Sequence, residues 1–332
     1  MAMNYKFLGR SGLKVSSLCF GTMTFGAEAD EAESAAMFRA CRDAGINFFD
    51  CADIYAGGRS EEILGRLIRD GREDVVITSK AYFATSKDVN AMGASRRHLM
   101  SAVEASLRRL GTDRVDVYFI HRFDDRTALE DTLRALDDLV RQGKVVYTGA
   151  SNFAAWQVAK ALGICQNSGW APLTCIQPMY SLVKRQAEVE ILPMAQSEKL
   201  GVIPYSPLAG GLLSGKYEAG PAPERGRLMN HKISQMRYGE AWYHEVAGRF
   251  AAFARERGLD PVSLAIAWAG SHPAVTAPII GARTVGQLRA CLAAADVPMT
   301  EGLRAEISAL SPEPPPATDR NEERTEFSFG IR

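Results

Sequence analysis

The 332-residue chain has no excess of charge of either sign. It carries 39 Lys and Arg against 39 Asp and Glu, so its formal net charge at pH 7 is +0. Proteins that bind nucleic acid or anionic membranes over a broad surface usually show a basic excess. The composition therefore disfavours both partners. At 46% hydrophobic and 23% charged residues it is instead typical of a folded protein with a large core.

The six cysteines are scattered and contain no C-x-x-C pair. Zinc sites and disulfide frameworks need short, regular spacings, so we expect no metal ion, no disulfides and a reducing compartment. The N-terminus also lacks the apolar segment of a secretory signal. Residues 261–282 contain no Asp, Glu, Lys or Arg, but their prolines and glycines favour a helix, a turn and a buried strand over a membrane span. We expect a cytoplasmic protein that does not bind a membrane.

The glycines lack the spacing of a dinucleotide-binding loop. None of the 29 lies two positions from another, so G-x-G-x-x-G is absent. The stretch from Gly210 to Lys216 approaches a P-loop, but Tyr217 stands where Ser or Thr would hold magnesium, and no helix pattern follows. What remains is a glycine loop with a lysine after the seventh expected strand. In (β/α)8 barrels this region commonly binds phosphate.

Short apolar runs alternate with amphipathic stretches along most of the chain. The runs are nearly continuous in β-branched and aromatic residues, which is typical of parallel strands buried on both faces. They cover residues 17–21, 46–50, 75–80, 115–121, 145–151, 174–177, 202–206 and 277–281. Helical patterns cover residues 31–45, 60–71, 95–111, 128–143, 154–163, 187–201 and 284–295. This alternation predicts an α/β fold, a (β/α)8 TIM barrel.

The ends of the chain depart from this rhythm. The lead-in with Ser11 and Gly12 at its turn predicts an N-terminal β-hairpin that closes the bottom of the barrel. Residues 218–239, rich in Gly, Pro and charge, predict a long loop after strand seven. Prolines from position 312 exclude a helix in the tail 311–332. We expect residues 1–332 to form one domain with its barrel core at about 15–295.

Ionisable residues stand where three successive strands end. Asp50 ends strand two, Lys80 strand three and His121 strand four, and Tyr55 follows in the loop after Asp50. Active sites of such barrels lie at the carboxyl ends of the strands. Taken alone, His121 could be a hydrogen-bonded structural histidine, and Lys80 could simply form an ion pair with Asp50. Together they indicate a functional site, because buried charges are costly and ionisable clusters in a cleft mark function.

Tyr55 gains chemical interest from Lys80. A nearby ammonium favours the phenolate and so lowers the pKa of a tyrosine toward working pH. We therefore expect Tyr55 to be a general acid for a developing alkoxide. Polar residues also end strands five to seven, namely Ser151, Asn152, Gln177, Tyr205 and Ser206.

These residues lie in motifs that resemble the aldo-keto reductase family over nearly the whole chain, from the N-terminal hairpin to about residue 295. The combination of motifs is most similar to the branch that contains bacterial general reductases and β subunits of voltage-gated potassium channels. The motifs are FGTMTFG (20–26), FFDCADIYAGG (48–58), ITSK (77–80), DVYFIHRFD (116–124), GASNF (149–153), IQPMYS (176–181), PYSPLAGGLLSGK (204–216) and IIGARTVGQL (279–288).

The resemblance implies a catalytic tetrad and a cofactor, NADPH/NADP+. Tyr55 would protonate the carbonyl oxygen as hydride arrives, Lys80, held by Asp50, would tune Tyr55, and His121 would orient the carbonyl. Ser151, Asn152 and Gln177 would hold the nicotinamide amide and Tyr205 would stack on its ring, while Arg283 would meet the 2′-phosphate. The implied cofactor-binding set is Gly21, Thr22, Asp50, Ser151, Asn152, Gln177, Tyr205, Ser206, Leu208, Gly210, Lys216, Gly281, Arg283 and Gln287.

Three positions depart from the pattern of this branch. Ala290 and Cys291 replace the usual Glu-Asn that contacts adenine, which leaves the preference for NADPH over NADH less strictly fixed. Cys51 replaces the usual threonine after Asp50, and we expect it to be a small buried filler. Residues that follow strand ends are expected to wall a largely apolar substrate pocket: Met23, Phe25, Tyr82, Phe83, Arg122 and Phe123.

We therefore expect an NADPH-dependent reductase of aldehydes or ketones with a small carbonyl substrate. A redox-sensing NADPH-binding accessory subunit with vestigial catalysis is the main alternative. A Schiff-base aldolase using Lys80 is a third hypothesis, but it leaves Ser151, Asn152 and Gln177 without a task. The sequence does not fix the physiological substrate or the oligomeric state.

Overall fold

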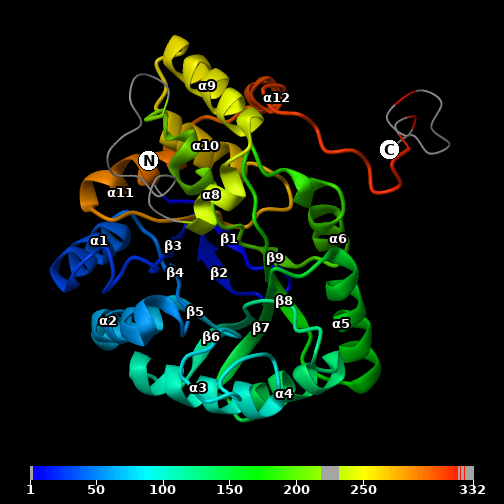
Figure 1. Ribbon diagram of the computed structural model, residues 1–332. Coiled ribbons are helices and arrows are strands. Elements are labelled where there is room, and N and C mark those ends of the chain that lie inside the picture. Colours follow the sequence, from blue (N-terminus) through cyan, green and yellow to red (C-terminus); the bar gives the residue numbers. More distant parts are fainter. Residues whose placement is uncertain (1–2, 218–231, 321, 323–324, 326–332) are drawn as a thin grey trace.

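The computed structural model describes residues 3–217, 232–320, 322 and 325. All eight expected strands are present and pair in parallel in one sheet, in the order β10-β3-β4-β5-β6-β7-β8-β9 (Figure 1). The strands are β3 (Cys19–Gly21), β4 (Phe48–Asp50), β5 (Val76–Ala81), β6 (Val115–Ile120), β7 (Val145–Ser151), β8 (Leu173–Gln177), β9 (Gly201–Val202) and β10 (Ile279–Ile280).

Backbone hydrogen bonds join the two edges of this sheet. The Thr276 amide donates to the Val202 carbonyl at 2.8 Å, and the Ile279 amide donates to the Pro204 carbonyl at 2.8 Å. The sheet therefore closes on itself, and the expected (β/α)8 barrel is confirmed. Strands seven and eight are shorter than expected because Pro204 and Pro278, with no amide hydrogen, cannot donate to a neighbouring strand.

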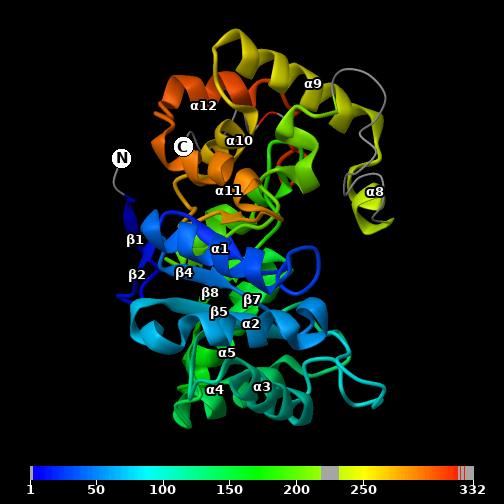
Figure 2. The same ribbon diagram turned by 90° about the vertical axis from the view of Figure 1, so that its left-hand side faces the viewer.

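The expected N-terminal hairpin is also confirmed. Strands β1 (Tyr5–Phe7) and β2 (Lys14–Ser16) pair antiparallel, and Leu8 at the start of their turn is fully buried. Leu8 packs in an interior cluster with Phe48 and Phe119, while a Cβ on Gly9 would lie 2.5 Å from the Gly201 amide nitrogen. Figure 2 shows the hairpin at the edge of the barrel. It closes the end where the strands begin.

Helices follow the strands in the expected order, with ends shifted by a few residues. Gly111 and Gly169 cap α3 and α5 in the left-handed conformation, with φ of 63° and 66°, as the glycines after the periodic segments indicate. The helices are α1 (Glu31–Asp43), α2 (Arg59–Ile68), α3 (Arg96–Leu110), α4 (Leu129–Arg141), α5 (Ala155–Ser168), α6 (Ile191–Ser197) and α11 (Val285–Leu292).

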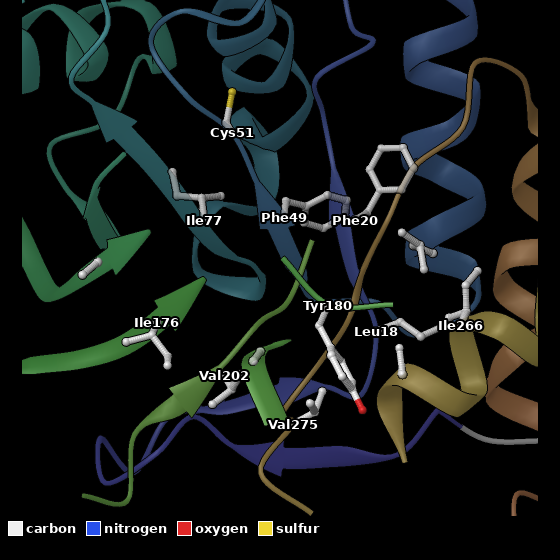
Figure 3. Packing of buried hydrophobic residues seen from close by; sticks show 14 of the residues in the cluster. Leu18, Phe20, Phe49, Cys51, Ile77, Ile176, Tyr180, Val202, Ile266 and Val275 are labelled. Carbon is white, nitrogen blue, oxygen red and sulfur yellow. The ribbon is translucent and has the colours of Figure 1, made fainter. Parts of the chain in front are cut away.

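The main core lies between these helices and the outer face of the barrel. Figure 3 shows part of it, with Phe20, Phe49, Ile77 and Ile176 from the strands together with Tyr180. Cys51 lies in the same core without exposed surface, and burial is the largest effect that raises its pKa to about 12. The expectation that Cys51 is a buried filler is confirmed.

The segment after strand seven is more helical than expected. Lys232–Tyr238 forms helix α8, so the expected loop 218–239 is wrong for these residues; residues 218–231 lie outside the described part of the chain. The prolines of the segment and all its glycines except Gly239 stand before Lys232, so nothing interrupts a helix between Lys232 and Tyr238. Helices that the sequence analysis did not single out are α9 (Ala241–Glu256) and α12 (Glu301–Ser308).

The uncharged window 261–282 forms helix α10 (Pro261–Gly270), a turn and strand β10, as expected. Within the described residues, no helix is both long and apolar enough to cross a bilayer. Residues 311–320 form neither helix nor strand and run away from α12 (Figure 1). The prolines there account for the absence of a helix.

Candidate active site

Three of the four tetrad residues are in direct contact at the carboxyl ends of the strands. Asp50 ends β4, Lys80 lies near the end of β5, and Tyr55 begins the 3-10 helix η1 (Tyr55–Gly58). The Lys80 Nζ donates to Asp50 Oδ2 at 2.7 Å, to the Cys51 carbonyl at 2.7 Å and to Tyr55 Oη at 3.4 Å. One ammonium therefore joins the carboxylate to the phenol.

The Asp50 carboxylate is held from several sides. Its Oδ1 accepts from Thr78 Oγ1 at 2.6 Å and from Gln177 Nε2 at 2.8 Å, and its Oδ2 accepts from Lys80. Lys80 is fully buried and Asp50 is 2% exposed. A buried ion pair persists only when its remaining polar atoms are also satisfied, and both oxygens of Asp50 are.

Lys80 stays charged in this setting. Burial alone lowers its pKa, but Asp50 and Tyr55 together raise the pKa of Lys80 above its usual range. A protonated lysine is a poor nucleophile toward a carbonyl. This observation counts against the Schiff-base aldolase.

The expected depression of the Tyr55 pKa is wrong for the structure. Burial is the largest effect and raises the pKa of Tyr55 to about 12, although Lys80 lowers it and Asp50 raises it. The sequence indicated the ammonium but not the depth of burial, nor the carboxylate that offsets the ammonium. Tyr55 therefore keeps its proton at neutral pH, as a proton donor must.

His121 follows β6 on the same side of the barrel. Its ring makes an edge contact with Tyr55 at 6.2 Å between centroids and with Phe83 at 4.9 Å. Burial and then Lys80 lower the pKa of His121 to about 3, so the imidazole is neutral at pH 7. Its Nδ1 is buried without a hydrogen-bond partner in the described part of the chain.

Four of the polar residues that end strands five to seven form one hydrogen-bonded network, in which Asn152 Nδ2 donates to Ser151 Oγ at 3.0 Å. Ser151 Oγ donates to the Gln177 carbonyl at 3.0 Å, and Asn152 Nδ2 donates to the His121 carbonyl at 2.8 Å. Tyr205 Oη donates to Asn152 Oδ1 at 2.7 Å. Because Gln177 also donates to Asp50, this network is continuous with the Lys80 ion pair.

The glycine loop after strand seven has a run of residues in the left-handed region. The φ values are 60° at Ser206, 50° at Ala209, 68° at Gly210 and 97° at Gly211. Left-handed turns of this kind are found in anion-binding concavities. Within the loop, the Ala209 amide donates to the Ser206 carbonyl and the Gly211 amide to the Leu208 carbonyl, both at 2.9 Å. The Lys216 Nζ lies beside this loop, 3.1 Å from where a Cβ on Gly211 would be. The lysine ammonium beside these left-handed turns suits an anionic group.

The residues of the opposite rim, at and after the ends of β3 and β10, differ in how accessible they are to a cofactor. Arg283 is half-buried, and its amide donates to Gln287 Oε1 at 3.1 Å. Gly281 is exposed, and Gly21 lies against Ile279, whose Cγ2 would be 2.9 Å from a Cβ at that position. Leu208, across the mouth, is half-buried at the start of the glycine loop.

Thr22 is fully buried, and its hydroxyl donates to the Asp50 carbonyl at 3.0 Å. Its hydroxyl is therefore already engaged, and the expected cofactor contact of Thr22 stays a prediction. Cys291 is 2% exposed and Ala290 half-buried, so neither offers an exposed polar side chain where a glutamate and asparagine are usual.

Aromatic and apolar side chains surround the mouth. Met23, Phe83 and Arg122 are exposed, and Tyr82 contacts Phe83 edge-on at 5.3 Å. The expectation that Phe25 lines the pocket is wrong, because Phe25 is fully buried and packs on Phe20 in the core. The turn after β3 directs it inward, which the sequence position alone did not reveal.

Two residues at this face were missed. Trp156, at the start of α5, is 62% exposed, and its ring centroid lies 6.1 Å from that of the expected pocket residue Phe123. A tryptophan four residues after Asn152 was the available signal in the sequence. Arg237 in α8 lies 6.0 Å from the Tyr205 ring and was hidden by the expectation of a loop.

Comparisons with known proteins agree with the geometry. The profile of the Aldo/keto reductase family matches residues 17–311. A probable voltage-gated potassium channel subunit beta of Oryza sativa is 40% identical, over 89% of this chain and 92% of the relative. The uncharacterized oxidoreductase YrpG of Bacillus subtilis is 37% identical, over 94% of this chain and 97% of the relative.

A versiconal hemiacetal acetate reductase of Aspergillus parasiticus is 33% identical, over 90% of this chain and 94% of the relative. The family resemblance expected from the motifs is thereby confirmed, including its two kinds of relative. Family membership, together with relatives named as oxidoreductases, supports a general oxidoreductase function. The chain belongs to the aldo/keto reductase family.

Proposed function

We propose that the protein is an NADPH-dependent oxidoreductase that reduces aldehydes or ketones to alcohols, with Tyr55 as the general acid. The observation that carries this proposal is the Lys80 ammonium, 2.7 Å from Asp50 and 3.4 Å from the Tyr55 hydroxyl. The buried cation fixes the phenol at the mouth of the barrel. A neutral phenol there can donate a proton to a carbonyl oxygen.

The cofactor is proposed to lie across the mouth from the glycine loop to the rim at Arg283. The left-handed turns at Ser206, Gly210 and Gly211, with Lys216 beside them, would hold the pyrophosphate. Ser151, Asn152, Gln177 and Tyr205 would hold the nicotinamide, and Arg283, Gln287 and Gly281 the adenosine end. The half-buried guanidinium of Arg283 suits a 2′-phosphate fork.

NADPH, when bound, supplies the hydride to the carbonyl carbon. The protein residues manage the carbonyl oxygen: Tyr55 gives it a proton, and His121, neutral because its pKa is lowered to about 3, orients it by hydrogen bonding. Lys80 then stabilises the phenolate that Tyr55 becomes, because opposite charges attract strongly in a buried site. Asp50 keeps Lys80 protonated throughout.

Met23, Tyr82, Phe83 and Arg122 are proposed to contact the substrate. Their mixture of apolar surface and one cation suits a small aromatic or aliphatic carbonyl compound. We also propose a cytoplasmic location, since all six cysteines are buried and unpaired.

The direct test mixes purified protein with NADPH and a panel of aromatic and aliphatic aldehydes and follows the loss of NADPH absorbance. We expect turnover with at least one aldehyde. NADPH binding without turnover on any aldehyde would contradict the reductase function and favour the alternative below.

A second function is favoured by two relatives that are named as potassium channel β subunits, at 40% and 39% identity. In this alternative the protein is an NADPH-binding accessory subunit that senses redox state, and catalysis is vestigial. Co-purification of a partner protein in the presence of NADPH, and its release with NADP+, would support it. Equal recovery of a partner with either form of the cofactor would exclude the sensing role.

A further inference from the structure

A second group of buried ionisable residues lies behind β5, on the opposite face from Lys80. Neighbouring residues of a strand point to opposite faces, so Ser79 points away from the barrel interior, toward α2 and α3. Ser79 Oγ donates to Glu61 Oε1, and Arg109 donates from Nε to Glu61 Oε2 at 2.7 Å. Glu61 is fully buried and Arg109 is half-buried. This group takes no part in the proposed chemistry.

Asp53 lies beside this group with an unusual environment for a carboxyl group. It is 2% exposed, and neither of its carboxyl oxygens has a hydrogen-bond partner in the described part of the chain. Its backbone amide donates to the Lys80 carbonyl at 3.1 Å, which fixes the segment between Asp50 and Tyr55 onto β5. An unpaired buried carboxylate is costly, so the neutral form is favoured here.

The charged and titratable groups around Asp53 come from four elements. They are Glu61 of α2, Arg109 of α3, Lys80 of β5 and Tyr118 of β6. Burial is the largest effect, and with Glu61 it raises the pKa of Asp53 to about 7. Arg109, Lys80 and the nearby Ile54 amide lower it, although that amide makes no hydrogen bond to either carboxyl oxygen. The Tyr118 hydroxyl is likewise buried without a partner among the described residues.

The same group touches the far end of the turn that carries Tyr55. Gly58, the last residue of η1, has a φ of 95°, and a Cβ there would lie 2.8 Å from Arg109 Cδ and 2.9 Å from Arg109 Nε. The side chain of Arg109 therefore lies directly against Gly58. Asp53 precedes Tyr55 by two residues and Gly58 follows it by three, so the turn is held at both ends.

We propose that Asp53 is a positioning residue for Tyr55, and that ionisation of its carboxyl group shifts the η1 turn and slows proton donation. The inference rests on the proposed function of Tyr55. An ionised Asp53 competes with Glu61 for Arg109, because Arg109 already pairs with Glu61 and is the cation with the largest lowering effect on the pKa of Asp53. Movement of Arg109 then moves Gly58, and with it the phenol. A displacement of about 1 Å is enough to slow a positioned reaction strongly.

The first experiment measures the single-turnover rate of NADPH oxidation with a reactive aldehyde between about pH 5 and about pH 9. Neither Tyr55, with a pKa of about 12, nor His121, at about 3, titrates in this range. The inference predicts a rate that falls on the order of tenfold with a midpoint near the pKa of Asp53. Asp53→Asn should abolish this fall, because the amide cannot ionise.

A matched control is Asp137→Asn. Asp137 is also a buried carboxyl group, but it lies on α4 and pairs with Arg141. Its variant should keep the fall. If Asp53→Asn does not fold, Glu61→Gln serves instead: removal of the neighbouring negative charge should move the midpoint to lower pH. An unchanged midpoint in a folded Glu61→Gln protein, or the same fall in Asp53→Asn, would overturn the inference.

A second readout separates this inference from the proposed function. The 13C resonance of the Tyr55 ring, labelled at Cζ and assigned with Tyr55→Phe, should shift with the ionisation of Asp53 in the wild type and not in Asp53→Asn. A shift without turnover on any aldehyde would retain the coupling and reject the reductase function. Turnover without any shift in the wild type would reject the coupling and retain the reductase.

Discussion

The Tyr55 hydroxyl lies 3.4 Å from a buried ammonium and still has a raised pKa, at about 12. Burial and Asp50 together outweigh the attraction of Lys80. This raised pKa affects reduction and oxidation differently. Reduction needs the neutral phenol, which is the dominant form at neutral pH, whereas oxidation of an alcohol needs the scarce phenolate.

Alcohol oxidation is therefore expected to speed up with pH. Between about pH 8 and about pH 10, above the titration of Asp53, its rate should rise by roughly tenfold per pH unit, as the phenolate fraction does below a single pKa. Steady-state NADP+ reduction with a benzylic alcohol measures this slope. A plateau below about pH 9 would show that the phenol ionises far more easily than the structure indicates.

At the Lys80–Asp50 pair, removal of one partner should lower the free energy of unfolding more than removal of both. Lys80→Met leaves Asp50 buried without its cation, and broken buried ion pairs cost about 3–5 kcal/mol. Urea denaturation should show a loss of that order, with part of it recovered in the double variant Lys80→Met with Asp50→Asn. If the single variant is as stable as the wild type, the ion pair is not buried in solution.

The sequence was sufficient to predict which residues meet at the mouth of the barrel, but not how deeply their side chains are buried. Asp50, Lys80 and His121 stand at strand ends, and strand ends coincide in a barrel, so their proximity follows from the pattern. Burial depends on elements far away in the chain. That is why the pKa direction of Tyr55, the inward position of Phe25 and the engaged hydroxyl of Thr22 were not foreseen.

Among the elements, the glycine loop η4 (Ala209–Ser214) has a backbone that limits substitution. Gly211 has a φ of 97°, and a Cβ there would approach Lys216 Nζ to 3.1 Å. An L-residue in the left-handed region costs about 1–2 kcal/mol. The loop should therefore lose its anion-binding shape if Gly211 is replaced.

Gly211→Ala should raise the Kd for NADPH by about tenfold, since tenfold corresponds to about 1.4 kcal/mol. Titration of NADPH fluorescence measures it. Gly163→Ala is the control, because Gly163 lies in α5 with nothing within 4 Å of a Cβ, so alanine is tolerated or stabilising. Equal affinities in the two variants would place the pyrophosphate elsewhere.

The strands were predicted more reliably than the segment after strand seven. Buried parallel strands are marked by nearly continuous apolar runs. Strands β9 and β10 are shortened by the prolines at 204 and 278, and β3 and β4 each begin two residues later than expected. Helix α8 has seven residues and a weak pattern, and the glycines and prolines just before it favoured a loop. Its helical state depends on packing against η4, where Tyr238 lies 3.3 Å from a Cβ on Gly210.

On the scale of the whole molecule, zero net charge conceals a local arrangement. Lys216 beside the glycine loop and Arg283 on the facing rim are proposed to meet the two ends of an anionic dinucleotide. A ligand that binds only the folded state stabilises it by mass action, by about 2.7 kcal/mol at a hundredfold excess over Kd. NADPH should therefore protect the whole barrel against heat.

The thermal midpoint should rise more with NADPH than with NADH at equal concentration, because only NADPH carries the 2′-phosphate. Arg283→Ala should reduce the NADPH effect toward that of NADH and leave the NADH effect unchanged. Differential scanning fluorimetry gives both numbers. Equal protection by the two cofactors in the wild type would assign Arg283 another role, and the replacement of Glu-Asn by Ala290 and Cys291 would then be the first place to look.

Tyr55 is proposed to donate the proton in an NADPH-dependent carbonyl reduction. The most direct measurement is the single-turnover rate of NADPH oxidation by Tyr55→Phe, beside a fluorescence titration of NADPH binding. We expect a loss of at least about a hundredfold in rate with NADPH affinity retained. A rate near that of the wild type would contradict the claim, because the phenylalanine ring has no proton to give.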